Sequence, residues 1–103
     1  MHRLTFVVNG QNLVKLKGFD GLVAGTKGHL QAHFTFTGDW SGLRKVAVFT
    51  CRSGEYPVLI TNNTCMVPDE VAACESFKVH IVGKLLDGGK LPSSRVTVIQ
   101  RRH

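Results

Sequence analysis

Two histidines, His29 and His33, lie four residues apart, a spacing that could place two imidazoles on one metal ion. That spacing brings side chains together on a helix, but the surrounding segment alternates apolar and polar residues as a strand does. On a strand the two α-carbons would lie about 13 Å apart, too far to chelate one ion. We therefore interpret both as solvent-facing side chains. His80 also falls on a predicted exposed strand face and has no evident catalytic partner.

The three cysteines, Cys51, Cys65 and Cys74, do not have the spacing of a metal site. We interpret them as reduced and mostly buried thiols. A bridge between Cys51 and Cys65 would require two strands to bring them together, and the sequence leaves this open. Arg52 follows Cys51 and could lower the pKa of its thiol, although a cysteine at a strand end more often serves packing.

The remaining polar residues show no catalytic pattern. The acidic residues mostly occupy predicted turns, where aspartate forms local hydrogen bonds, and no two are spaced for acid–base chemistry. The serines lack a nucleophile elbow, and the glycines form neither a dinucleotide-binding nor a phosphate-binding loop. We expect no enzymatic activity, no cofactor and no metal.

Length and charge restrict the class of protein. The 103 residues suit one domain, residues 1–103, and their 13 Lys and Arg against 7 Asp and Glu give a net charge of +6. The basic residues form small separated groups, so we expect an acidic protein surface as the partner in preference to nucleic acid. No segment has the length of a signal peptide's apolar region or of a membrane span, so we expect synthesis in the cytoplasm and no membrane partner.

The elements that must position these residues are strands. Leu30, Ala32, Phe34 and Phe36 alternate with polar residues between positions 29 and 37, as in a half-buried strand. Other strands are expected at residues 4–8, 12–17, 46–49, 56–60, 65–67, 77–84 and 95–100, with one helical turn at 68–74. Seven or eight strands with short turns predict an all-β fold, an antiparallel β-sandwich.

Several short motifs occur in a characteristic order. A glycine-bearing loop at residues 22–28 precedes Phe34-Thr35-Phe36, then Gly38-Asp39-Trp40-Ser41-Gly42-Leu43, then Ala47-Val48-Phe49. Further on stand Cys65-Met66-Val67-Pro68 with Glu70-Val71, a strand at 77–83 ending in glycine, and Ser94 to Val98. This series, which spans nearly the whole chain, resembles the immunoglobulin-like domains of tailed-bacteriophage structural proteins.

The resemblance implies an immunoglobulin-like sandwich and structural roles for its motif residues. These residues are Phe34, Phe36, Trp40, Gly42, Leu43, Phe49 and Pro68. Trp40 and Leu43 would anchor a turn between core strands, Gly42 would permit that turn, and Pro68 would end a strand.

The function that the resemblance implies is a non-enzymatic virion component in the tail, neck or baseplate of a phage or prophage. The protein would be made in the cytoplasm of the bacterial host. Its expected partners are other phage structural proteins, and we also expect a homo-oligomer.

Two other classes stay open. A sandwich that binds carbohydrate on a cell surface would need exposed aromatic side chains. Only Trp40 and Tyr56 are available for this, and the position of each is also explained by packing in the core. A small basic nucleic-acid-binding domain would need aromatics among basic residues on an exposed face. Phe34, Phe36 and Phe77 fall instead on predicted core faces.

Overall fold

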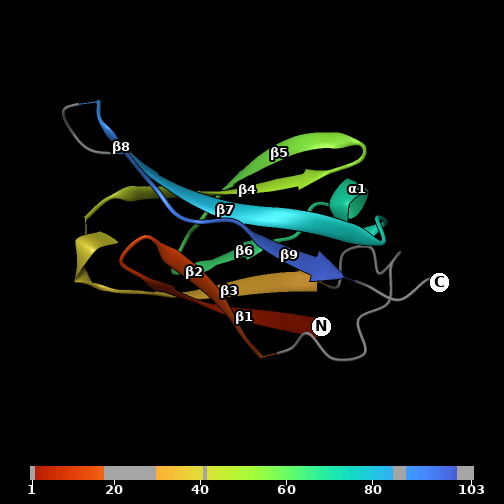
Figure 1. The fold of residues 1–103 in the computed structure, drawn as a ribbon, viewed down its shortest axis with the longest axis horizontal. Coiled ribbons are helices and arrows are strands. Elements are labelled where there is room, and N and C mark those ends of the chain that lie inside the picture. The colour runs from red at the N-terminus through yellow and green to blue at the C-terminus, as the bar shows by residue number, and fades with distance from the viewer. Residues whose placement is uncertain (1, 18–29, 41, 85–87, 100–103) are drawn as a thin grey trace.

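The computed structural model describes residues 2–17, 30–40, 42–84 and 88–99, which form two β-sheets packed face to face (Figure 1). The strands are β1 (His2–Asn9), β2 (Asn12–Lys17), β3 (Leu30–Phe36), β4 (Arg44–Cys51), β5 (Gly54–Leu59), β6 (Thr64–Met66), β7 (Ser76–Lys84), β8 (Lys90–Pro92) and β9 (Val96–Ile99). A 3₁₀ turn, η1 (Gly38–Trp40), and one short helix, α1 (Asp69–Ala72), complete the described elements. The all-β sandwich predicted from the alternation is confirmed.

The first sheet has the order β2-β1-β3-β6, and the second has the order β5-β4-β7-β8 with β9 also paired to β7. One pairing departs from the antiparallel expectation, because β1 and β3 run parallel. Parallel neighbours need a long connection between them. Here the chain passes through β2 and residues 18–29 before it returns as β3.

The described residues contain nine strands, one more than the larger number expected. The additional strand is β8, which pairs with the end of β7 before the chain continues into β9. Ser93 separates the two because its hydroxyl accepts a hydrogen bond from the Ile81 amide at 2.7 Å, where a strand carbonyl would otherwise accept it. The proline before it, Pro92, has no amide proton to donate.

The core consists of the alternating apolar side chains of both sheets. Those with no exposed surface include Leu4, Phe6, Val8, Ala32, Trp40, Ala47, Phe49, Val79 and Ile81. A row of aromatic rings crosses the first sheet, with centroids 5.1 Å apart between Phe6 and Phe34 and 5.8 Å apart between Phe34 and Phe36. The residues expected on inner faces therefore lie there, because a period of two places them on one side of a sheet.

Trp40 closes one end of this core. Its ring centroid lies 5.6 Å from that of Phe36, and its indole Nε1 donates a hydrogen bond of 2.7 Å to the Gly10 carbonyl in the β1–β2 turn. On the second sheet, Gly83 of β7 leaves room for the ring, since a Cβ there would lie 3.0 Å from Trp40 Cζ3 and from Leu43 Cδ1. Gly42 has a φ of 77°, which favours glycine in this turn.

We call the packing of Trp40 against Phe36, Leu43 and Gly83 the tryptophan corner. Gly83→Ala should destabilise the protein by about 1–3 kcal/mol, because the added methyl group overpacks this corner. Gly38→Ala is the matched control, since a Cβ at Gly38 meets nothing within 4 Å. Urea unfolding of both variants and the wild type measures the effect. Equal stability of the two variants would contradict this packing.

Candidate functional site

Five of the seven motif residues singled out from the sequence lie in or against the core, while Gly42 is exposed in a turn and Pro68 is half-buried. Phe34, Trp40 and Phe49 are buried, and Phe36 and Leu43 pack against them. Pro68 precedes α1, and its carbonyl accepts hydrogen bonds from the amides of Val71 and Ala72. Their contacts are those of packing and turn formation, so the motif carries the fold and leaves the outer surfaces to be considered separately.

The histidines do not converge on one site. His29 lies outside the described residues. His33 sits half-buried on the outer surface of the first sheet, where its Nε2 lies 3.1 Å from Gln31 Oε1, and burial followed by the charge of Arg3 lowers its pKa. Within the described ranges, no group of three or more His, Cys, Asp or Glu side chains could hold a metal, and no helix is long and apolar enough to cross a membrane.

The outer surface of the second sheet is apolar at its centre. The register aligns Leu59, Val46, Val82 and Pro92 in one row across β5, β4, β7 and β8. A second row joins Pro57 of β5, Val48 of β4 and His80 of β7. We call these seven residues the apolar face.

The burial of the apolar face is uneven. Val48 is 8% exposed although it lies outside the core cluster, because its neighbours on the same face cover it. Leu59 is 56% exposed at the edge of the face. Beyond Leu59 the face continues into an open groove of about 400 Å³, whose lining includes Leu43, Arg44 and Ile60.

Basic residues surround the apolar face. Arg44, Lys84 and Lys90 pair across β4, β7 and β8, so three cations stand in one row at one end of the sheet. Lys78 lies towards the other end, opposite Thr50, and Arg95 acts electrostatically on His80. All five are exposed. Glu55, paired to Thr50, is the one acidic residue that the described strands place on this face.

His80 lies in the middle of the apolar face and is half-buried, not exposed as the alternation had suggested. Its Nδ1 is buried and has no hydrogen-bond partner among the described residues. Burial lowers the pKa of the imidazole, Arg95 lowers it further, and Glu55 acts in the opposite direction. The centre of the face is therefore uncharged at neutral pH.

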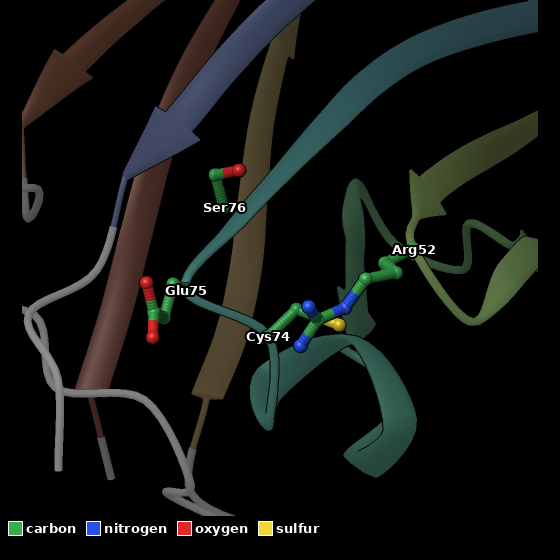
Figure 2. A pocket seen from close by; sticks show the side chains of 4 residues that line it. All are labelled: Arg52, Cys74, Glu75 and Ser76. Carbon is green, nitrogen blue, oxygen red and sulfur yellow. The ribbon is translucent and has the colours of Figure 1, made fainter.

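The cysteines meet in a way that the sequence did not indicate. All three are free thiols; Cys65 is buried in β6, while Cys51 and Cys74 share a side-chain hydrogen bond. The structure therefore has no disulfide between Cys51 and Cys65, which the sequence had left open. Figure 2 shows the neighbouring pocket, a cavity of about 250 Å³ lined by Arg52, Cys74, Glu75 and Ser76. No sequence spacing reveals this pair, because α1 and its flanking turns bring Cys74 back to the end of β4.

The burial of His80 predicts an imidazole that titrates below 6.5. Because its pKa is lower in the folded than in the unfolded protein, the unfolded state takes up the proton first, and His80 costs stability as the pH falls below about 6.5. The titration of the His80 ring protons by NMR checks this. A midpoint at or above 6.5 would contradict the burial.

Comparisons of the chain with protein-family models, with curated proteins and with solved structures give no match in any of the three.

Proposed function

We propose that this chain is a non-enzymatic assembly domain of a bacteriophage or prophage virion, in the tail, neck or baseplate. In this proposal the apolar face docks onto another structural protein of the virion. The docking is inferred from the apolar centre of the β5-β4-β7-β8 sheet and from the basic residues around it. We call these basic residues the rim: Arg44, Lys78, Lys84, Lys90 and Arg95. The virion setting rests on the sequence motifs, whose order resembles that of the phage immunoglobulin-like domains.

The charges of the rim determine the kind of partner. Five exposed cations and one carboxylate surround the face, so a complementary surface would carry acidic residues around an apolar patch. Burial of Leu59, Val46 and Val82 in the interface supplies the affinity. The charges of the rim orient the partner and raise the rate of association. The proposed partner is therefore an acidic protein surface.

A second copy of this chain is a poorer occupant of the same face. A two-fold pairing would place the row of Arg44, Lys84 and Lys90 in an interface whose other half is equally basic. The predicted homo-oligomer would thus use another surface. Light scattering on the purified protein measures self-association separately from docking.

The other two classes receive less support from the described residues. Trp40 has no exposed surface, and Tyr56 is half-buried against the core, so neither offers a platform on which a sugar ring could stack. The apolar face carries valine, leucine and proline around the half-buried His80, and it has no phenylalanine, tyrosine or tryptophan on which bases could stack.

The virion assignment predicts that the protein is a stoichiometric part of purified particles. Particles from the phage or induced prophage that encodes this chain would be isolated by density gradient and analysed by quantitative mass spectrometry. A fixed copy number per particle is expected. Recovery of the protein only from the soluble lysate would contradict the assignment.

Docking through the apolar face predicts that Leu59→Glu lowers incorporation into particles by about tenfold or more. The substitution removes a leucine that would be buried in the interface, and it adds a negative charge that repels an acidic partner. Leu16→Glu is the matched control, since Leu16 is 58% exposed on the first sheet, close to the 56% of Leu59. Circular dichroism would verify that both variants fold. Equal incorporation of the two would contradict docking through this face.

A further inference from the structure

The thiols of Cys51 and Cys74 occupy a site apart from the apolar face, at the end of β4. We propose that they form a dithiol site, which a small acidic disulfide of the glutathione class converts to an intramolecular disulfide. This inference does not depend on the virion setting or on the docking partner.

Two segments distant in sequence meet at this site. Cys51 is the last residue of β4 and pairs with Gly54 across the turn formed by Arg52 and Ser53. Cys74 follows α1, and its amide donates a hydrogen bond of 3.0 Å to the Val71 carbonyl, which holds the turn after the helix.

The sulfur atoms are also held in place. Cys74 Sγ donates to the Glu70 carbonyl at 3.3 Å and lies 3.9 Å from the hydroxyl of Ser53, the residue two positions after Cys51. The two thiols also influence each other's pKa, which places the Cys51 and Cys74 side chains near each other. Formation of a disulfide therefore needs a local movement of two neighbouring side chains, one of which already lies beside Ser53 in the turn after Cys51.

Cys51 and Cys74 are both partly exposed and line cavities. Cys74 lines the cavity of about 250 Å³ in Figure 2, and Cys51 lines a neighbouring cavity of about 260 Å³; both cavities include Arg52 and Ser76. In Figure 2 the sulfur of Cys74 points towards the Arg52 side chain. Arg52 lines both cavities and Lys78 the second, against the single carboxylate of Glu75 in the first. This excess of cations favours a disulfide that carries carboxylates, as oxidised glutathione does.

The two thiols differ in reactivity. Burial raises the pKa of Cys51, but hydrogen bonds from Cys74, Ser53 and Gly54 outweigh it and leave the pKa below its usual value. The hydrogen bond with Cys51, together with burial, raises the pKa of Cys74. The hydrogen bond of 3.3 Å from Cys74 Sγ to the Glu70 carbonyl also keeps the proton on Cys74, so we assign Cys51 as the attacking thiolate and Cys74 as the resolving thiol. Burial raises the pKa of Cys65 to about 12, which keeps that thiol protonated and unreactive.

The exchange proceeds in two balanced steps. The Cys51 thiolate attacks one sulfur of oxidised glutathione, so that a mixed disulfide forms and one glutathione thiolate leaves. Cys74 then loses its proton to solvent and attacks the Cys51 sulfur of the mixed disulfide, which releases the second glutathione. Two protein thiols are oxidised, and one glutathione disulfide is reduced to two thiols.

The full chain would be incubated with oxidised glutathione, quenched in acid and measured by intact-mass spectrometry and peptide mapping. The expected product is lighter by two hydrogen atoms and contains a Cys51–Cys74 linkage. Its thermal midpoint should rise by roughly 10 °C relative to the reduced protein, because the bond closes the loop between β4 and β7. Cys65→Ser should react as the wild type does.

Two further variants keep the test decisive. Cys74→Ser should stop at the glutathione adduct on Cys51, since the resolving thiol is missing. Arg52→Ala should slow the reaction with oxidised glutathione several-fold but not the reaction with a neutral disulfide such as bis(2-hydroxyethyl) disulfide. A wild-type protein that stays reduced, keeps its glutathione adduct or links Cys65 would overturn the proposal.

Discussion

Strand β4 is apolar on both of its faces, and the rest of the structure depends on this. Ala47 and Phe49 point into the core between the sheets, while Val46 and Val48 form the middle of the apolar face. The same strand lies between β5 and β7, and it ends at Cys51 beside Cys74. The inner side of such a strand stabilises the sandwich. Its outer side adds to an apolar surface of the kind that usually marks an interaction site.

The tryptophan corner determines how this strand meets the other sheet. Trp40 contacts Phe36 from β3, hydrogen-bonds the turn after β1 and fills the space that Gly83 leaves on β7. Because these partners come from both sheets, the indole sets their separation where η1 leads into β4. The resemblance to the phage domains rests on this same stretch of sequence. The motif residues therefore account for the packing of this part of the core, and the apolar face must be argued from its own residues.

The sequence predicts what depends on local periodicity and misses what depends on pairing between distant segments. Alternation placed Leu30, Phe34 and Ile81 on inner faces, because a period of two is visible within one strand. The parallel β1–β3 pairing, the separate β8 and the meeting of Cys51 with Cys74 arise from long-range topology, which spacing does not encode. The basic residues also looked scattered, because Arg44, Lys84 and Lys90 become neighbours only through the register of three strands.

The proposed docking requires that the apolar face be covered in the assembled particle. Hydroxyl-radical footprinting tests it on the unmodified protein, because oxidation of leucine side chains follows their exposure to solvent. Leu59 and Leu16 are nearly equally exposed in the isolated chain, at 56% and 58%, and should be oxidised to similar extents there. In purified particles, docking through this face predicts that oxidation of Leu59 falls about tenfold relative to Leu16, because a contact at the centre of an interface excludes water. Equal oxidation of the two leucines in particles would contradict it.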